Sequence, residues 1–445
     1  MDRRTLPSVD QFVASLGDWS LPRALITEVA RSVIDEARTN PAQAPDLAAA
    51  AREQLEQLSR TRLQQVINAT GVILHTNLGR APLAPEAARA AHEVGVGYTN
   101  LELDLETGSR GRRSGFLLRL LADLTGAEAA LVVNNNAGAL VLALAALASG
   151  RSVIVSRGEL IEIGGAYRLP EIITAGGASL VEVGTTNRTR LADYRHAISD
   201  TTAALLKVHT SNYRVIGFTE ETALSALVEL AREVDVISIF DVGSGLLDER
   251  VPWLPGAPPR WLHGEPGVRQ AVEAGADLVL FSGDKMFGGP QAGILVGRSA
   301  LIARLSRQPL ARALRVDGPT VAALTATAEL YAGGGGAAIP FWSMATAVYG
   351  ELETRARRIL TDSRVGGHIE QSESMIGAGS APEAGLPSPV IVMEGRADVL
   401  FRALLRGHPP VLARREGGRL LVDLRAVPQE SDVALAGALT AACRS

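Results

Sequence analysis

Short runs of β-branched and other apolar residues alternate with longer segments from about Gly126 onward, and this alternation restricts the fold more than any other feature. Seven runs follow one another: Leu131–Val133, Val153–Val155, Leu180–Val183, Leu205–Val208, Val236–Phe240, Leu278–Phe281 and Ile294–Val296. The first six are separated by lengths that accommodate a helix, which is typical of parallel strands joined by crossover helices. The last interval is too short for one, so the seventh strand is expected to be antiparallel. We predict an α/β fold with a mostly parallel seven-strand sheet and helices on both faces.

Residues 1–62 indicate a separate small helical domain. Ser8 begins a capped helix, and apolar residues recur at helical spacing over 21–38 and again over 47–58. The eight arginines of this region are nearly balanced by nine acidic residues. A helical cap or a dimerisation arm would show the same pattern.

The remaining boundaries follow changes in pattern. The predicted sheet occupies 126–332, and 63–125 is expected to be a linker that also serves the oligomer or the active site. After a glycine run, residues 333–445 are typical of a smaller α/β domain with strands at Pro389–Met393 and Arg419–Leu424. A chain of 445 residues is longer than one hydrophobic core usually serves, in agreement with several domains.

Charge and cysteine content exclude several classes of protein. The net charge of −4 gives no general attraction to nucleic acid or to an anionic membrane. The single cysteine, Cys443, excludes an intramolecular disulfide and a cysteine-based zinc site. The longest apolar stretch, Ala137–Ala148, is too short to span a bilayer. We expect a soluble cytoplasmic protein with no membrane partner.

Lysine is nearly absent, because Lys207 and Lys285 are the only lysines among 44 basic residues. Arginine can replace lysine on most surfaces, but it cannot supply a deprotonatable amine. A lysine retained in such a chain is therefore a candidate for chemistry. Lys285 follows a strand within a glycine-rich turn, whereas Lys207 lies inside the run Leu205–Val208, where pairing or snorkelling is the simpler interpretation.

Polar residues follow three of the predicted strands, and their order along the chain indicates the chemistry of the site. Asn134–Gly138 opens an apolar helix and offers backbone N–H groups to a phosphate, although a plain Asn-capped turn would look the same. Asp241 ends a buried strand, where it would pair with a protonated ring nitrogen or simply cap a turn. Ser282 and Lys285 follow the next strand, with an amine able to form a Schiff base. This order is the layout of a pyridoxal-phosphate enzyme, and no metal site is expected.

Longer motifs resemble the bacterial L-seryl-tRNA(Sec) selenium transferases, also called selenocysteine synthases. The resemblance extends over essentially the whole chain, and several motifs are eight or more residues long. The matching segments are Val66–Arg80, Glu106–Arg113, Arg157–Gly165, Val183–Arg188, Lys207–Tyr213, Asp241–Gly245 and Ser282–Gly293.

The resemblance implies a fold-type-I pyridoxal 5'-phosphate enzyme that converts seryl-tRNA(Sec) to selenocysteinyl-tRNA(Sec). It implies elimination to an aminoacrylyl-tRNA, followed by addition of selenium from selenophosphate. Residues 1–62 would recognise the tRNA, and the chain would form a homodecamer, a pentamer of dimers. Because the charges of 1–62 are balanced, its phosphate contacts would come from a few placed arginines.

The resemblance also implies roles for individual residues. Lys285 would hold the cofactor aldehyde and act as the base. The remaining cofactor-binding residues would be Asp241, Ser282, Asn135, Asn136, Ala137, Gly138, His209 and Asn212. The anion-binding arginines would be Arg80, Arg312 and Arg315. The pattern assigns no definite role to His75, Arg157, Glu159, Thr185 and Thr186.

Two other interpretations stay open at the level of sequence. A pyridoxal-phosphate lyase acting on a small amino acid or amino-sugar phosphate would share Lys285, Asp241 and Asn134–Gly138. The helical region 1–62 favours the tRNA enzyme, since an enzyme that acts on a small substrate would have little use for this region. A catalytically inactive relative that binds RNA or acts as a scaffold would have no need to retain Lys285 together with Asp241.

Overall fold

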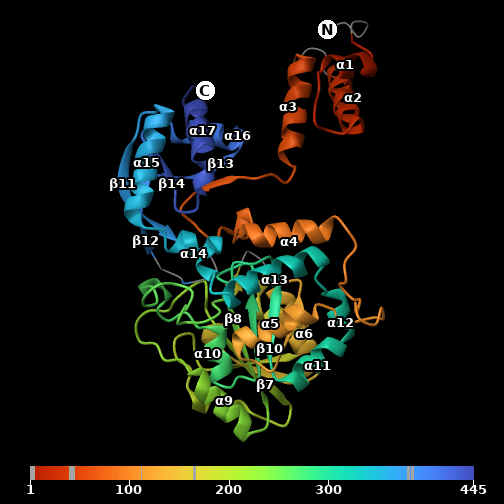
Figure 1. Ribbon diagram of the computed structural model, residues 1–445, viewed down its shortest axis with the longest axis vertical. Helices are drawn as coiled ribbons and strands as arrows, with labels where there is room; N and C mark the ends of the chain where they lie inside the picture. The colour runs from red at the N-terminus through yellow and green to blue at the C-terminus, as the bar shows by residue number, and fades with distance from the viewer. Residues whose placement is uncertain are drawn as a thin grey trace. The chain divides into compact units, whose positions relative to one another are not determined.

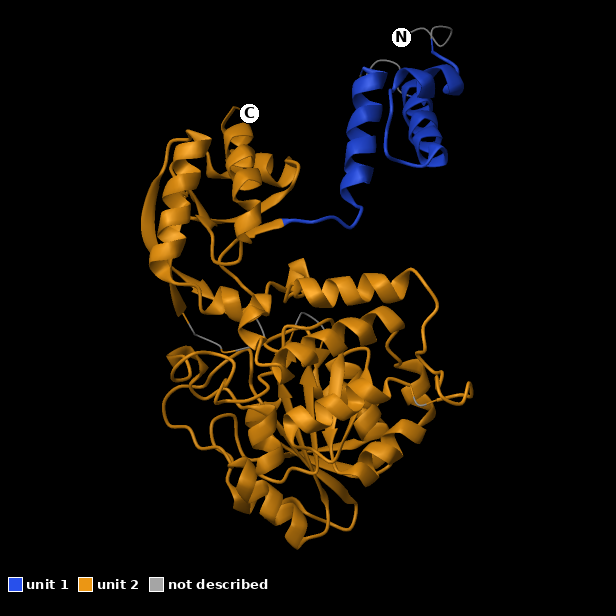
Figure 2. Cartoon of the chain, viewed as in Figure 1, with its two compact units in different colours: residues 1–66 blue, residues 67–445 orange. Residues whose placement is uncertain are grey.

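The computed structural model describes residues 6–39, 46–111, 113–163, 167–377, 381 and 385–444. The chain divides into two compact units, Met1–Val66 and Ile67–Ser445, which are described separately (Figure 2). Three residues of the motifs quoted above, Arg112, Gly164 and Gly165, lie outside the described residues.

The first unit is built from three helices, α1 (Val9–Ser15), α2 (Arg23–Thr39) and α3 (Leu47–Arg60). The Ser8 side chain accepts a hydrogen bond from the backbone N–H of Gln11, whose own side chain accepts one from Ser8, so the predicted capped start is confirmed. The helices share a hydrophobic core because their buried residues recur at helical spacing: Phe12, Ile26, Ala30, Val33, Ile34, Ala37, Leu47, Ala51 and Leu55.

The second unit contains the predicted seven-stranded sheet (Figure 1). Its strands are β2 (Ala129–Val133), β3 (Ser152–Ser156), β6 (Ser179–Val183), β7 (Thr202–Val208), β8 (Ile237–Gly243), β9 (Leu278–Ser282) and β10 (Gly293–Gly297). They lie in the order β2-β10-β9-β8-β7-β3-β6. All neighbours from β9 to β6 are parallel, and β10 is antiparallel to both β2 and β9. The mostly parallel sheet and its reversed last strand are therefore confirmed.

Helices cover both faces of this sheet, as predicted. Along β9, Val279 and Phe281 pack against one set of helices, and Leu278 and Leu280 pack against the other. The first set is α5 (Gly115–Thr125), α10 (Val268–Glu273) and α13 (Gly318–Ala332). The second set is α6 (Asn136–Leu147), α7 (Leu169–Ala175) and α11 (Ser299–Arg307). Both faces of the strands are buried, which explains why their sequences are continuous apolar runs.

A second sheet of five strands lies in the C-terminal part of the same unit. Its order is β1 (Ile67–Ala69), β13 (Val411–Glu416), β14 (Arg419–Asp423), β12 (Gly385–Met393) and β11 (His368–Met375). The predicted strand at 389–393 is confirmed as part of β12, and the one at 419–424 corresponds to β14, which ends one residue earlier. Strand β1 comes from the segment 63–125, and Ile67 and Ala69 are buried in the core of this sheet with residues of the C-terminal region. The division of the chain at residues 125 and 332 stays a prediction.

The remaining elements connect and cover these sheets. The C-terminal sheet is covered by α15 (Tyr349–Ser363), α16 (Ala397–Arg406) and α17 (Asp432–Arg444). The other helices are α4 (Pro85–Gly95), α8 (Leu191–Ala197), α9 (Leu224–Glu233), α12 (Pro309–Ala313) and α14 (Pro340–Ala345), and β4 (Glu162–Ile163) pairs with β5 (Tyr167–Arg168). In the part of the chain that the structure describes, each helix is too short or too polar to cross a bilayer.

Candidate active site

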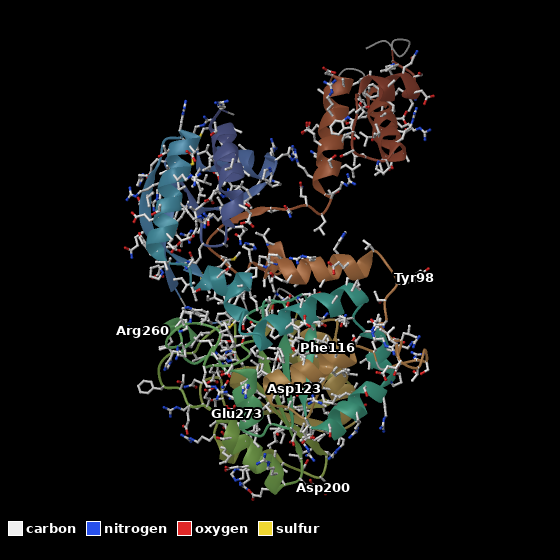
Figure 3. All side chains as sticks on the ribbon, viewed as in Figure 1. Tyr98, Phe116, Asp123, Asp200, Arg260 and Glu273 are labelled. Carbon is white, nitrogen blue, oxygen red and sulfur yellow. The ribbon has the colours of Figure 1, made fainter. Side chains whose placement is uncertain are left out.

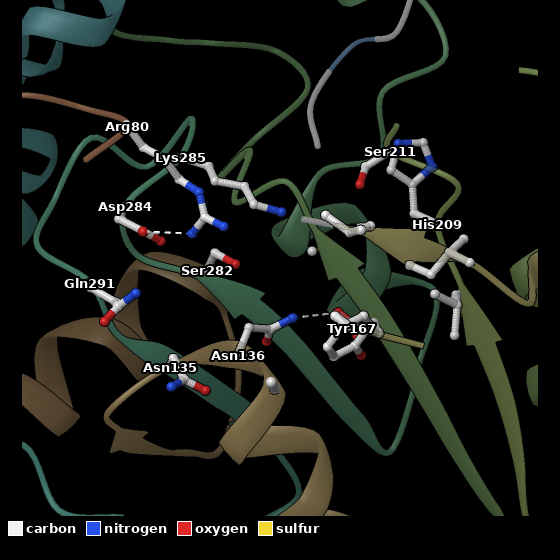
Figure 4. A pocket seen from close by; sticks show the side chains of 16 residues that line it. Arg80, Asn135, Asn136, Tyr167, His209, Ser211, Ser282, Asp284, Lys285 and Gln291 are labelled. Atoms are coloured by element: carbon white, nitrogen blue, oxygen red, sulfur yellow. Dashed lines mark hydrogen bonds and ion pairs between the residues drawn. The ribbon is translucent and has the colours of Figure 1, made fainter. Parts of the chain in front are cut away.

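A cavity of about 280 Å³ lies at the carboxyl end of the large sheet (Figure 4). Strands β7, β8 and β9 run parallel, so the residues that follow them meet at one edge, where open α/β sheets place their ligands. Eight residues predicted from the sequence line this cavity: Arg80, Asn135, Asn136, Ala137, His209, Asp241, Ser282 and Lys285. Segments far apart in the chain are thereby brought to one site.

Asp241 is a buried carboxylate beside this cavity. Its Oδ1 accepts a hydrogen bond of 2.8 Å from Asn136 Nδ2, and its side chain is almost fully enclosed. Burial raises the pKa of Asp241 above its ordinary range, and the hydrogen bond from Asn136 opposes this effect only in part. A carboxylate placed there therefore favours a cationic partner within the cavity.

The start of α6 forms a second wall. The side chain of Asn135 caps the helix by accepting a 2.8 Å hydrogen bond from the Gly138 backbone N–H. The backbone N–H groups of Asn136 and Ala137, in the same first turn, have no acceptor within the helix. Because the positive end of the helix dipole lies here as well, this turn can bind an anion such as a phosphate group.

Lys285 lies in the turn that follows β9 and is buried. Backbone hydrogen bonds hold this turn in place, from Gly283 N to Ala292 O at 2.8 Å and from Met286 N to Ser244 O at 3.0 Å. Burial, assisted by the nearby charge of Arg80, lowers the pKa of Lys285 to about 8. A substantial fraction of the amine is therefore neutral, and able to act as a nucleophile or base, near physiological pH.

The environment of Lys207 has the opposite effect on the pKa of its amine. Its Nζ lies 3.0 Å from Glu159 Oε1 and 3.7 Å from Glu221 Oε2. Burial alone would lower the pKa of Lys207, but these two carboxylates outweigh burial and raise it. Glu159 also accepts a 2.8 Å hydrogen bond from the backbone N–H of Val208. Lys207 thus stays protonated in an ion pair, in agreement with the pairing expected for it.

Arg80 lines the cavity and is held there by an acidic residue that the sequence interpretation missed. Its Nη1 lies 2.7 Å from Asp284 Oδ2, and Asp284 is buried. The Asp284 carbonyl also accepts a hydrogen bond of 3.2 Å from the backbone N–H of Ala81. Asp284 therefore fixes the guanidinium next to Lys285. Asp284 directly precedes Lys285, and this position in the sequence is a signal that could have identified Asp284.

Two further residues of this region have no local sequence signal. Glu265 is buried, and its Oε1 lies 3.2 Å from Nε2 of His209 without hydrogen-bond geometry. Tyr167, on β5, contributes a ring to the cavity wall together with Ile161 and Ile163. These residues come from loops and a short strand whose positions depend on the folded chain.

Four predicted residues do not line the cavity. Gly138 donates its backbone N–H to the Asn135 side chain, and a Cβ at this position would lie 2.9 Å from Asn134 Oδ1. Asn212 donates to the carbonyl of Glu162 at 2.8 Å. Arg315 pairs with Glu102 at 3.3 Å, and Arg312 lies on the short helix α12. Their predicted roles in binding cofactor and anion stay predictions.

Some residues without an assigned role have structural partners. Arg157 pairs with Glu182 at 3.0 Å. Thr185 and Thr186 lie in the turn after β6, where the Thr185 hydroxyl donates to the carbonyl of Arg188 at 3.1 Å. Burial lowers the pKa of His75.

The groups around the cavity fit pyridoxal 5'-phosphate. They include one amine with a lowered pKa, one buried carboxylate in need of a cation, and a helix start with free N–H groups. A buried side-chain oxygen of Asn136 also has no hydrogen-bond partner in the described structure. The apolar side chains Ile161 and Ile163 provide a surface suited to a planar ring.

Comparisons with known proteins identify the family of this chain. An L-seryl-tRNA(Sec) selenium transferase of Solidesulfovibrio magneticus is 44% identical, covering 99% of this chain and 98% of its own length. One from Carboxydothermus hydrogenoformans is 43% identical over 96% of this chain and 95% of its own. The solved structure of a D-glucosaminate-6-phosphate ammonia-lyase is 22% identical, with a TM-score of 0.61 over 87% of this chain and 97% of its own, and supports the fold-type-I architecture. Residues 66–428 match the family described as L-seryl-tRNA selenium transferase, and the chain belongs to that family.

Proposed function

We propose that this chain converts L-seryl-tRNA(Sec) to L-selenocysteinyl-tRNA(Sec), using pyridoxal 5'-phosphate as cofactor and selenophosphate as selenium donor. The observation that carries the proposal is the environment of Lys285, a buried amine with a pKa of about 8 beside Asp241, in a chain of this family. Arginine cannot provide this chemistry, which accounts for a lysine at this position of an arginine-rich chain.

The proposed contacts to the cofactor follow from the cavity. Lys285 would hold the aldehyde, and Asp241 would keep the ring nitrogen protonated. The first turn of α6, from Asn135 to Gly138, and the hydroxyl of Ser282 would bind the phosphate, while His209 and Asn212 would lie near the ring. When bound, this cofactor supplies an electron sink that stabilises negative charge at the carbon bearing the amino group.

Lys285 is the proposed proton carrier. Once the amino group of the seryl ester has replaced Lys285 at the aldehyde, the freed neutral Nζ would accept the α-proton as the β-hydroxyl leaves as hydroxide. The same amine would return a proton after selenium has bonded to the β-carbon. Arg80, held by Asp284, provides a fixed cation for the phosphate of the selenium donor. Water would then cleave the Se–P bond and release phosphate.

A homo-oligomer is part of the proposal, with ten copies as the number that the family resemblance implies. Arg312 and Arg315 do not line the cavity of their own chain, so we propose that assembly brings them to the donor site. Large apolar side chains are exposed in the segments next to α4 and α5, namely Val96, Tyr98, Leu105 and Phe116. Tyr98 and Phe116 are labelled in Figure 3. We propose that a second copy of the chain covers these exposed side chains.

We further propose that the first unit recognises the tRNA and that the enzyme acts in the cytoplasm. The unit has its own hydrophobic core, so a chain lacking residues 1–62 is expected to keep the second unit folded. Binding of the full chain and of the truncated chain should be measured with the selenocysteine tRNA and with the ordinary serine tRNA. Selective binding that disappears on truncation supports this role.

The activity itself is tested with the purified, cofactor-loaded chain. Seryl-tRNA(Sec) and selenophosphate should give selenocysteinyl-tRNA(Sec), detected by mass after hydrolysis of the ester. If the loaded chain neither binds this tRNA selectively nor forms the product, the proposal is wrong. A pyridoxal-phosphate lyase with a small substrate would then be the better interpretation.

A further inference from the structure

A second cavity, of about 370 Å³, adjoins the one that contains Lys285. The two cavities share Val208 and His209, which follow one another at the end of β7, so they meet at this strand end. The second cavity extends along the same edge of the sheet, past the ends of β3 and β6. Its volume is within the range of small-molecule binding sites. The cavity of about 520 Å³ beside α4 and α13 shares no lining residue with the Lys285 cavity.

The lining of the second cavity is polar but not strongly cationic. Thr185, Thr186 and Asn187 contribute hydroxyl and amide groups from one turn. Lys207 lines it too, but its charge is already paired with Glu159. Glu265 adds a buried carboxylate whose Oε1 lies 3.2 Å from His209 Nε2 but has no partner with hydrogen-bond geometry in the described structure. The carboxylates disfavour a phosphate deep in this cavity, whereas a neutral ligand with N–H and O–H donors suits it.

Aromatic and cationic side chains complete the cavity. Trp261 and Tyr213, both half-buried, contribute aromatic rings to the lining, and aromatic rings bind nucleobases by stacking. The exposed Arg188 and Arg214 line its outer part. Arg188 Nε donates a 3.2 Å hydrogen bond to the carbonyl of Phe218. Arg214 is therefore the better candidate for binding an anion at the mouth of the cavity. A polar interior with carboxylate acceptors, aromatic side chains and an outer arginine together match a nucleoside that carries a phosphodiester.

We propose that this second cavity binds the 3'-terminal nucleoside of the aminoacylated tRNA, an inference that rests on the function proposed above. An ester joins the serine to the terminal ribose, so only a few covalent bonds separate the reacting carbon from that nucleoside. With the serine next to Lys285, the nucleoside must lie in an adjoining space. Glu265 accepts a hydrogen bond from the base or the ribose, and Arg214 binds the last phosphodiester.

A photoreactive tRNA tests the placement directly. Selenocysteine tRNA ending in 8-azidoadenosine is bound to the cofactor-loaded enzyme, irradiated, and the modified peptides are identified by mass. Cross-links within 185–189, 213–221 or 261–265 are expected. Cross-links confined to other segments overturn the proposal. Product formation from unmodified seryl-tRNA is measured separately, so failure of the proposed function is distinguished from failure of this placement.

Kinetics of two arginine variants provide a second test. Arg214→Ala is expected to raise KM for seryl-tRNA(Sec) roughly 5- to 10-fold, an effect of about 1 kcal/mol, as for loss of one charge-assisted contact. The matched control is Arg195→Ala, because Arg195 is also exposed and pairs with Glu233 at 2.6 Å, and neither residue lines the cavity. Cofactor absorbance should stay unchanged in both variants. Equal KM values for the two variants contradict the proposal.

Discussion

The pKa of Lys285 leads to a prediction about how the cofactor-free protein takes up its cofactor. Only a neutral amine attacks an aldehyde, so the rate of attachment should follow deprotonation of Lys285. Burial and Arg80 lower this pKa from an ordinary value of 10.5 to about 8. At 1.36 kcal/mol for each pKa unit, the fold favours the neutral amine by roughly 3 kcal/mol.

This shift has a measurable consequence at neutral pH. At pH 7 about one Lys285 side chain in ten is neutral, against fewer than about one in a thousand for an ordinary lysine. The rate of pyridoxal-phosphate attachment, followed by absorbance after mixing, should rise nearly tenfold from pH 6 to pH 7. It should then level off above about pH 8.5.

Two variants separate the causes of the shift. Arg80→Met removes a cation that lowers the pKa of Lys285, so the midpoint of the rate profile should move to higher pH. Lys207→Met should leave the midpoint unchanged, because that amine is already paired with Glu159. A wild-type rate that keeps rising up to pH 10 would refute the reasoning, since burial would then not perturb this amine.

Three further predictions concern attachment, selenium addition and the turn that holds Ser282. Lys285→Ala should leave no cofactor-modified peptide after borohydride reduction; modification at another lysine would reassign the anchor. Arg312→Ala combined with Arg315→Ala should let dehydrated aminoacyl-tRNA accumulate without incorporating selenium, measured by mass; failure of the elimination instead would give these arginines another role. Gly245→Ala should lower the melting temperature and weaken cofactor binding, because Gly245 has φ +78° and a Cβ would lie 2.4 Å from the Ser282 carbonyl oxygen. The left-handed conformation alone costs about 1–2 kcal/mol, so an unchanged melting temperature would contradict the strain expected at Gly245.

The parts of the fold that follow from local pattern were predictable. The seven strands of the large sheet are buried on both faces, which requires continuous apolar runs that can be recognised without knowing the fold. The reversed strand β10 followed from the short interval after β9. Strand β1 was not predicted, because three residues carry too little periodicity and its partner β13 lies far along the chain.

The residues that we propose to bind the cofactor could be brought together in prediction where they follow strands in a fixed order. Asp241 and Lys285 end neighbouring parallel strands, and the sheet brings them together. Contacts from outside this order were not predictable. Arg80 and Asp284 are 204 residues apart, and no sequence pattern indicates that they form a pair. Glu265 lies in a loop after η5 (Arg260–Leu262), with no preceding strand to mark it.

The sequence by itself determined the family, the α/β class and the identity of the lysine most suited to chemistry, because these depend on residue type and on spacing along the chain. The tertiary structure decided how each lysine titrates. Lys285 is buried near a cation, which favours the neutral amine, whereas Lys207 is buried against carboxylates, which favour the charged one. Burial and neighbouring charge are properties of the folded chain, and they arise only when distant segments pack around each side chain.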